Sequence, residues 1–467
     1  MDAPRRHAPR ARGAGRHLRD PMEPAPHLRG MGCEARPRRR RHPAVRAPLR
    51  VAPPDPLVPW PPPAMTHPAL EPGRIGPLHL RNRIVKTATF EGMTPQGRVT
   101  SRLVEHHAAF ARRKVGLSTV AYGAVEREGR TFEHQLVVDG EARDGLARLA
   151  RAVHREGDAV SLQLSHCGGF TKVARPVKGP SPGFNPYGIA AGRGWVRAME
   201  EADLDRVEAA FVRAATVARD AGFDAVELHL GHGYLLSQFL SPVLNRRRDR
   251  YGGDLEGRLR FPLRVVTRVV DAVADRLAVL CKINVDDGVA GGLDPAEAAQ
   301  VAVALEAAGV HGIVTSGGLV QRSAFFLLRG EVPLRAMARH EDGLLQRWAM
   351  RGLGRIFVPS YPWSPGFFLE SGRHIVEAVR IPVVALGGLD GAHTLRRAAE
   401  AGYRFFALGR ALLADPDFVE RLERGEEPTS RCDHCNLCVA AMDEGVRCVR
   451  FERPKSAEDR ARRAATP

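Results

Sequence analysis

The chain has 467 residues, of which 44% are hydrophobic and 26% are charged, a composition typical of a globular protein. No uninterrupted apolar run approaches the length that spans a bilayer, so the sequence argues against a membrane protein. The formal net charge of +17 first suggests a nucleic-acid partner. However, residues 1–64 hold 14 Arg and 5 acidic residues, whereas the remaining chain has a nearly balanced 56 basic and 48 acidic residues.

Residues 1–64 also contain 15 of the 35 Pro and too few apolar residues to form a core. This segment lacks the continuous apolar stretch of a secretory signal. An Arg-rich tail that binds an acidic partner is one interpretation. The other is a disordered leader, or upstream sequence that precedes a start at Met65. We expect a disordered leader over 1–64 and a second charged tail over residues 452–467.

From Met65 onward, short β-branched runs alternate with amphipathic helical stretches that often end in glycine. Eight runs are predicted as strands: Arg83–Thr89, Ser118–Val125, Ala159–Ser165, Ala225–Leu230, Ala278–Val285, Gly312–Ser316, Pro382–Leu386 and Phe405–Leu408. Helices are predicted between them, for example over Ala142–Glu156, Leu204–Ala221, Pro295–Ala308 and Ala392–Ala401.

This alternation predicts parallel strands joined by helical crossovers, in either a closed barrel or an open doubly wound sheet. The count of eight favours the barrel, and so do the polar residues at the carboxyl ends of the strands, because barrel active sites occupy that face. We therefore expect an α/β fold with a single (β/α)8 TIM barrel over residues 65–430. A cysteine-rich segment with a charged tail follows over 431–467.

One connection, from Gly317 to Ile381, is far longer than a usual strand-to-helix loop. It carries six aromatic residues: Phe325, Phe326, Tyr361, Trp363, Phe367 and Phe368. Connections of this length usually serve a function, so we predict a lid or a binding loop.

Four of the seven cysteines gather near the carboxyl end, at Cys432, Cys435, Cys438 and Cys448. The others, Cys33, Cys167 and Cys281, are isolated, so the pattern is not a secreted disulfide framework and fits a reducing cytoplasm. Three thiols within seven residues have the local spacing of an iron–sulfur ligand set. Three alternatives stay open: an iron–sulfur cluster such as [4Fe–4S], a structural zinc site, or cysteines without metal.

The strongest motif is E-L-H-L-G-H-G-Y-L-L-S-Q-F-L-S-P, which begins at Glu227. His229 ends a predicted strand, and His232 and Tyr234 follow in the turn. A lone histidine on a strand is commonly structural, but two histidines and a tyrosine at the catalytic end of a barrel form a candidate site. Imidazole N–H groups can hold an oxygen on which charge develops, and a phenol can deliver a proton to carbon.

This motif, continued by N-R-R-R-D-R-Y-G-G over Asn245–Gly253, resembles the Old Yellow Enzyme family of NADH:flavin oxidoreductases. The stretches L-R-N-R-I-V-K, Q-L-S-H-C-G, G-G-L-D and F-F-A-L-G-R-A-L-L-A-D-P extend the resemblance from about Leu70 to the cysteines. The barrel is also similar to those of dienoyl-CoA reductase and trimethylamine dehydrogenase, and the cysteine segment resembles their cluster-binding segments. Those relatives carry further nucleotide-binding domains. Because only 19 residues follow Cys448, we expect no such domain in this sequence.

The resemblance implies FMN as cofactor and NADH or NADPH as electron donor. The implied FMN contacts are the backbone of Thr87, Ala88 and Thr89, that of Tyr122 or Gly123, Gln163 at the pyrimidine, Lys282 near N1 and O2, and Gly388, Gly409 and Arg410 at the phosphate. Glycines that admit backbone N–H groups and an arginine fork suit a phosphate at this face of a barrel. The resemblance also implies that His229 and His232 bind the substrate oxygen and that Tyr234 donates a proton. Residues 245–253 match a structural stretch.

Two positions depart from the family pattern. Phe90 stands where several ene-reductases have Cys or Thr, and Lys-Thr-Ala-Thr from Lys86 replaces a turn that usually contains Pro. These departures leave the substrate less defined than the cofactor.

We expect an FMN-dependent oxidoreductase that uses NAD(P)H to reduce an electron-poor alkene, such as an enone, in the cytoplasm. One alternative is an FMN and iron–sulfur dehydrogenase of an amine or enoyl substrate that passes electrons to an external carrier. An alternative of another class is a nucleic-acid-associated module that uses the Arg-rich leader, which is disfavoured because no interleaved basic and aromatic surface is evident. The sequence leaves open whether the protein forms a homo-oligomer.

Overall fold

The computed structural model describes residues 66–189, 192–340 and 358–451, together with residues 347, 348, 352 and 354. The chain divides into two units, Met1–Pro62 and Pro63–Pro467. The first unit lies outside the described residues, and so do the predicted leader and the predicted tail over 452–467.

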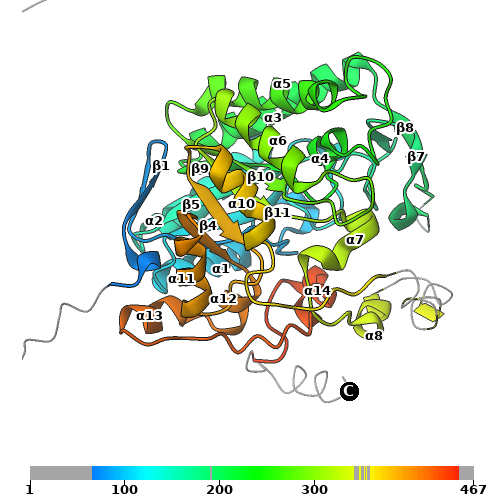
Figure 1. The fold of residues 1–467 in the computed structure, drawn as a ribbon. Coiled ribbons are helices and arrows are strands. Elements are labelled where there is room, and N and C mark those ends of the chain that lie inside the picture. Colours follow the sequence, from blue (N-terminus) through cyan, green and yellow to red (C-terminus); the bar gives the residue numbers. More distant parts are fainter. Residues whose placement is uncertain are drawn as a thin grey trace, which may run out of the picture. The chain divides into compact units, whose positions relative to one another are not determined.

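Eight parallel strands of the second unit close into a barrel (Figure 1), which confirms the predicted TIM barrel over the doubly wound sheet. The strands follow one another around the barrel in chain order, and the last pairs with the first. They are β3 (Ile84–Lys86), β4 (Leu117–Ala124), β5 (Ala159–Ser165), β9 (Ala225–Leu230), β10 (Ala278–Asn284), β11 (Gly312–Ser316), β12 (Val383–Leu386) and β13 (Phe405–Leu408).

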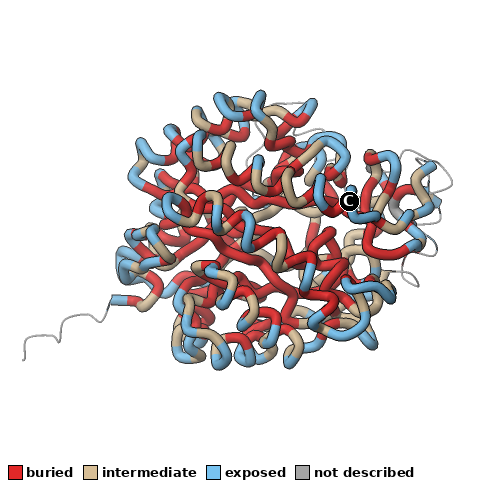
Figure 2. Tube along the Cα trace, turned by 90° about the horizontal axis from the view of Figure 1, so that it is seen from above, coloured by how far each residue is buried: buried red, intermediate tan, exposed pale blue. Residues whose placement is uncertain are grey.

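Helices surround the barrel and turn their apolar faces toward the strands, while their outer faces are exposed (Figure 2). In α2, for example, Leu146, Leu149, Ala150 and Val153 are buried because they recur at helical spacing on one side. The helices that follow the barrel strands are α1 (Ser101–Arg112), α2 (Arg143–His154), α3 (Glu201–Asp220), α5 (Leu255–Val273), α6 (Pro295–Ala307), α10 (Leu369–Ala378), α11 (Ala392–Glu400), α12 (Arg410–Ala414) and α13 (Phe418–Glu423).

Two layers of apolar side chains stabilise this arrangement. One fills the space between the strands and the helices, and the other lies inside the barrel, where Val85, Leu280 and Phe405 meet. A hairpin of β1 (Gly73–Ile75) and β2 (Leu78–Leu80) adds Ile75 and Leu80 to the interior layer. This filled interior leaves the carboxyl ends of the strands as the place for a ligand.

The loops at the carboxyl ends of the strands carry additional elements. A small sheet of β6 (Lys178–Gly179), β7 (Gly183–Phe184) and β8 (Trp195–Ala198) lies between β5 and α3. The short helix α4 (Leu235–Leu240) follows β9, and α7 (Val320–Leu327) and α8 (Leu334–Met337) belong to the long connection after β11. The cysteine segment forms α14 (Leu437–Ala440). None of the helices in the described residues is long and apolar enough to cross a membrane.

Candidate functional site

Four polar side chains meet at the carboxyl end of the barrel interior. Gln163 of β5 pairs in register with Glu227 of β9, and His229 of β9 pairs with Lys282 of β10. Lys282 Nζ lies 2.8 Å from Glu227 Oε1 and donates a hydrogen bond of 3.3 Å to the hydroxyl of Thr87. The structure therefore brings predicted cofactor residues of β5, β10 and the loop after β3 to one place, together with the predicted catalytic residue His229 of β9.

Glu227 determines the orientation of the Gln163 and Lys282 side chains. Its Oε1 accepts a hydrogen bond of 2.6 Å from Gln163 Nε2 as well as the contact from Lys282. Because an ionised carboxylate only accepts hydrogen bonds, the Gln163 amide nitrogen must face Glu227, and its carbonyl oxygen is left for another donor. The side chain of Lys282 is 1% exposed, and the carboxylate of Glu227 provides a negative charge beside it. Sequence reasoning missed this role of Glu227, although its motif begins there.

His229 presents a defined hydrogen-bond donor to the site. Its Nδ1 accepts a hydrogen bond of 3.3 Å from the Gly231 backbone N–H, so a neutral ring carries its proton on Nε2. Burial lowers the pKa of His229 well below its usual range, and the neighbouring His232 and Lys282 lower it further. The neutral Nε2–H can donate to an oxygen of a bound molecule.

His232 lies in a tight turn directly beside His229. Its φ of 59° is left-handed, and the ring centroids of the two histidines are 4.8 Å apart. Its backbone N–H donates to Asn284 Oδ1 at 2.9 Å, and its Nε2 lies 2.6 Å from the hydroxyl of Ser316. Burial lowers the pKa of His232 to about 3, with a further contribution from Lys282. Asn284 and Ser316 orient this ring, and the sequence motif did not reveal either of them.

Tyr234 directly precedes α4 and packs against His229, with ring centroids 4.6 Å apart. Its hydroxyl donates a hydrogen bond of 2.7 Å to the hydroxyl of Tyr122, at the end of β4. Burial raises the pKa of Tyr122 well above its usual range, and the proximity of Tyr234 raises it further. Phe90, Phe132 and Phe170 surround the two phenols. The predicted histidines and tyrosine thus lie together beside an aromatic cluster.

The predicted phosphate end lies where β12, β13 and the loop after β3 meet. Gly388 has φ 72°, and a Cβ on it would lie 2.5 Å from the backbone nitrogen of Gly366, so only glycine fits there. A Cβ on Gly409 would lie 3.2 Å from Thr87 Cγ2. The Thr89 hydroxyl is buried and has no hydrogen-bond partner in the described part of the chain. An unsatisfied hydroxyl among glycines fits a site that receives hydrogen bonds from a ligand such as FMN.

Arg410 lies between the predicted phosphate end and the cysteine segment. Its Nη1 donates to the carbonyl oxygens of Leu328 and Arg329 and to Asn436 Oδ1, at 2.6 to 3.1 Å. The same arginine lines a cavity that contains all four clustered cysteines, Cys432, Cys435, Cys438 and Cys448. Burial raises the pKa of Cys438 to about 12, and the positive charge of Arg410 opposes the shift. The six described cysteines are all free thiols.

The spacing of these sulfur atoms bears on the choice of metal. Among the described residues, Glu91, His106 and His107 form the one group of three or more metal-type ligand atoms that lie within 4.8 Å of one another. The cysteine sulfurs are therefore more widely spaced than a tetrahedral zinc ion with bonds of about 2.3 Å requires.

In the group of Glu91, His106 and His107, the carboxylate of Glu91 already forms a buried ion pair with Lys86. Lys86 Nζ lies 3.0 Å from Glu91 Oε1, so this carboxylate already has a cation beside it. Burial lowers the pKa of Lys86 and raises that of Glu91. A metal ion would have to displace the ammonium group, and the arrangement does not favour one.

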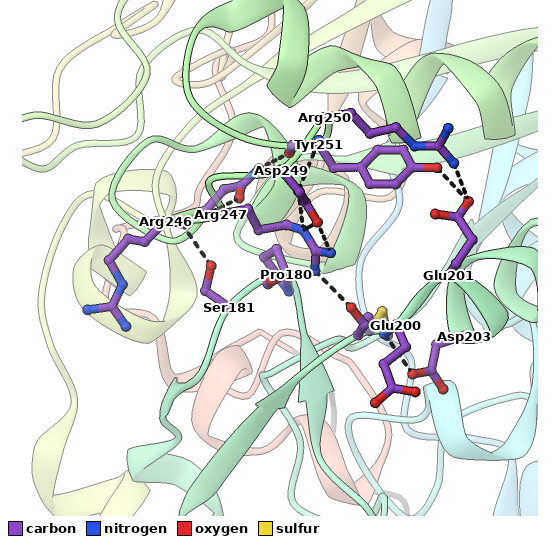
Figure 3. Close-up of polar contacts among 12 residues, drawn as sticks. Pro180, Ser181, Glu200, Glu201, Asp203, Arg246, Arg247, Asp249, Arg250 and Tyr251 are labelled. Carbon is purple, nitrogen blue, oxygen red and sulfur yellow. Dashed lines mark hydrogen bonds and ion pairs between the residues drawn. The ribbon is translucent and has the colours of Figure 1, made fainter.

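The charged loop over Asn245–Gly253 contacts both the small sheet and the start of α3, as Figure 3 shows. Arg247 donates to the carbonyl oxygens of Pro180 and Met199, which flank the small sheet, at 2.9 and 2.8 Å. Tyr251 donates to Glu201 at the start of α3, and Arg250 contacts the same carboxylate. These contacts agree with the structural role expected for this stretch.

The described parts of the long connection lie against the cysteine segment. Asn436 donates to the carbonyl oxygens of Leu328 and Glu331, at 2.7 and 2.8 Å. Trp363 stacks on His434, with centroids 3.9 Å apart. Residues 341–346, in the middle of the connection, lie outside the described residues, so the predicted lid stays a prediction.

Residues 69–323 match the family described as NADH:flavin oxidoreductase / NADH oxidase, and the chain belongs to this family. The expected relationship to the Old Yellow Enzyme group, with FMN as cofactor and NAD(P)H as electron donor, is thereby confirmed. The protein is a flavin-dependent oxidoreductase.

Individual relatives agree with this assignment. The chain is 40% identical over 390 residues to a 4,4'-dithiodibutanoate disulfide reductase of Rhodococcus erythropolis, covering 83% of this chain and 96% of that protein. It is 32% identical over 384 residues to an NADH oxidase of Thermoanaerobacter brockii, covering 79% of this chain but only about half (52%) of that protein. An Old Yellow Enzyme homologue from Zymomonas mobilis superposes with a TM-score of 0.59 at 20% identity, over 79% of this chain and 96% of that chain, which supports the fold.

Proposed function

We propose that the enzyme uses NAD(P)H to reduce the carbon–carbon double bond of a small electron-poor alkene such as an enone. The observation that carries this proposal is that His229, His232 and Tyr234 lie together, beside Gln163, Glu227 and Lys282. FMN, when bound, would supply the hydride that reaches the β-carbon of the alkene. The remaining steps depend on residues of the chain.

Each residue has one part in this scheme. The neutral Nε2–H of His229 donates to the substrate carbonyl oxygen and stabilises the negative charge that develops there. His232, held by Asn284 and Ser316, completes the binding site for that oxygen. Tyr234 transfers its phenolic proton to the α-carbon. Thr89, Gly388, Gly409 and Gln163 would hold FMN, and Lys282 would offset negative charge on its ring.

The experiment that tests this proposal separates the two half-reactions of Tyr234→Phe. Reduction by NADPH does not use the phenolic proton, so flavin content and the rate of reduction should stay near those of the wild type. Reoxidation by 2-cyclohexenone should slow on the order of 10²- to 10⁴-fold, because the general acid is lost. Stopped-flow absorbance of the flavin measures both rates. Reoxidation at the wild-type rate would show that Tyr234 is not the proton donor.

A second candidate substrate is an organic disulfide, supported by the 40% identity to the 4,4'-dithiodibutanoate disulfide reductase over 96% of its length. Two electrons and two protons cleave the sulfur–sulfur bond and yield two thiols. A departing thiolate needs no proton at the moment of cleavage, since a free thiol has a pKa near about 8.5. Tyr234→Phe should therefore slow reoxidation by 4,4'-dithiodibutanoate much less than reoxidation by the enone, and wild-type rates with the two compounds rank the candidates.

We also propose that Cys432, Cys435, Cys438 and Cys448 bind an iron–sulfur cluster in the cytoplasm. All four line one cavity, their sulfurs are more widely spaced than a zinc site requires, and the cation of Arg410 faces them. Such a cluster would allow electrons to pass to an external carrier, which corresponds to the dehydrogenase alternative.

A further inference from the structure

Tyr122 faces the site because strand β4 is irregular where it occurs. Along β4, Leu117 points into the barrel and Val120 packs outward among the helices, so strict alternation would turn Tyr122 outward as well. The register between β4 and β5 shifts between Val120 and Gly123. Such a bulge redirects a side chain, and here Ala121 and Tyr122 both pack with Tyr234.

A buried ion pair supports this bulge. The backbone N–H of Ala121 donates to the carboxylate of Glu91, at 2.9 and 3.0 Å from its two oxygens, rather than to strand β5. Lys86 Nζ contacts Glu91 and donates to the carbonyl oxygen of Thr119, at 3.2 Å. Glu91 thus accepts a hydrogen bond from the Ala121 N–H, and Lys86 donates one to the Thr119 carbonyl oxygen. Both backbone groups lie where the strand is irregular, and these hydrogen bonds satisfy them.

The bulge places one hydroxyl against another. The hydroxyl oxygens of Tyr122 and Tyr234 are 2.7 Å apart, and the two residues are 6% and 5% exposed. The ring of Tyr122 also meets those of Phe90 and His229, with centroids 5.5 and 6.4 Å away. Water has little access to this pair, and Tyr122 is in direct contact with the Tyr234 hydroxyl, so it can respond to a change of charge there.

We propose that Tyr122 is a positioning residue for the proton donor: its hydroxyl holds the Tyr234 phenol in place and donates a hydrogen bond to the Tyr234 oxygen as that oxygen gives up its proton. This inference rests on the proposed role of Tyr234. It assigns Tyr122 a side-chain role, whereas the sequence suggested only a backbone contact with FMN.

The proton balance of this step is simple. The Tyr234 hydroxyl turns its proton from Tyr122 toward the α-carbon of the alkene that has received the hydride. The O–H bond then breaks, and a C–H bond forms at that carbon. Tyr122 keeps its own proton and rotates its hydroxyl from accepting to donating. Because burial raises the pKa of Tyr122, this proton is present throughout the working range of the enzyme. Tyr234 regains a proton from solvent after the product leaves.

The test compares Tyr122→Phe, Tyr234→Phe and the double variant, with NADPH as reductant and 2-cyclohexenone as oxidant. Tyr122→Phe keeps the ring and removes one hydroxyl, so NADPH reduction should be unchanged while reoxidation slows roughly 10- to 100-fold, the effect of a lost hydrogen bond to a charged group. The double variant should reoxidise no more slowly than Tyr234→Phe, because Tyr122 acts through Tyr234. Tyr251→Phe, which removes a hydroxyl that bonds Glu201 outside the site, is the matched control.

Two results would overturn the inference while leaving the role of Tyr234 intact. One is a Tyr122→Phe enzyme that reoxidises at the wild-type rate although Tyr234→Phe is slow. The other is a double variant that is slower than Tyr234→Phe by the full factor of Tyr122→Phe, because independent effects multiply. The double variant removes both hydroxyls, so neither is left buried without a hydrogen-bond partner. Its reoxidation rate can therefore be measured even if Tyr122→Phe binds flavin poorly. If Tyr234→Phe itself reoxidises normally, the proposed function fails first.

Discussion

At the scale of single residues, the charge state of His229 and His232 determines what kind of oxygen the site can hold. Burial lowers the pKa of both rings, that of His232 to about 3, and the Lys282 cation adds to both shifts. Both imidazoles are therefore neutral in the folded enzyme at ordinary pH. A neutral pair suits a carbonyl oxygen that acquires charge only during the reaction.

The first residue-scale prediction is that binding of 2-cyclohexenone to the oxidised enzyme does not depend on histidine ionisation. Its dissociation constant should be flat between about pH 5 and pH 8, the range in which an ordinary histidine titrates. Flavin absorbance changes on ligand addition measure this constant. A change in affinity with a midpoint near about pH 6.5, the usual histidine value, would show that one ring is charged in the complex.

The same pKa shifts have a consequence for stability. The unfolded chain takes up protons on these histidines as the pH falls below about 6.5, whereas the folded enzyme does not. The contribution of the neutral rings to stability is therefore fully present above that pH and declines as the pH falls. Burial of the active site thus makes the enzyme less stable in acid.

Some site residues could be predicted from sequence because each ends a strand or follows one. Gln163, His229 and Lys282 are of this kind, since parallel strands bring their carboxyl ends to one face of the barrel. The position of the Tyr122 phenol could not be predicted in this way. A bulge in β4 interrupts the alternation of inward and outward side chains on which such a prediction depends. The role of Ser316 depends on a contact with His232, 84 residues away along the chain, which no local pattern encodes.

At the scale of elements, the strands of the barrel were predicted well, and the short strands outside the barrel were not. The predicted bounds of β5, β9, β11 and β13 agree with the structure. The first barrel strand was predicted to Thr89 but ends at Lys86, where its partner β13 ends at Leu408. The small sheet of β6, β7 and β8 was missed because its strands, of two to four residues, contain no continuous apolar run like that of β13.

The cysteine segment is the element whose cofactor can be tested most directly. After anaerobic purification, elemental analysis should find roughly four iron atoms per chain and broad absorbance beneath the flavin bands, as a [4Fe–4S] cluster requires. Replacing Cys435 and Cys438 together by Ser should remove the iron and leave FMN in place, since the four thiols line a cavity of their own. Cys281→Ser, in a buried strand of the barrel, is the control variant that should keep its iron.

Two other results would reject the cluster. About one zinc ion per chain would indicate a structural metal site instead. Absence of both metals, with all four thiols alkylated in the folded enzyme, would mean that the segment is held by protein contacts alone. Those contacts, from Asn436 and Arg410 to the carbonyl oxygens of Leu328 and its neighbours, would then account for its position.

At the scale of the whole molecule, the domain organisation stays a proposal that rests on composition. Residues 1–64 have no apolar periodicity, and much of the excess positive charge lies there. The barrel, in contrast, closes through β13 and β3, and its interior layer includes the hairpin that begins at Gly73. We therefore expect the boundary of the independently folding part to fall between the leader and this hairpin.

The corresponding prediction is that deleting residues 1–64 leaves FMN content, melting temperature and the rate of NADPH reduction near those of the full chain. His67, whose ring contacts the carbonyl oxygen of Ala392 at 3.0 Å, stays in this truncated protein. Deleting residues 1–81 is the matched control, because it also removes Ile75 and Leu80, which are 0% and 4% exposed in the barrel interior. Each of these side chains contributes about 1.5–3 kcal/mol through burial, so the longer deletion should lower the melting temperature and flavin content sharply. Thermal unfolding followed by flavin fluorescence measures both proteins. If the shorter deletion lowered the melting temperature and flavin content as much as the longer one, the leader would be part of the folded enzyme, and its arginines would contribute to the stability of the barrel.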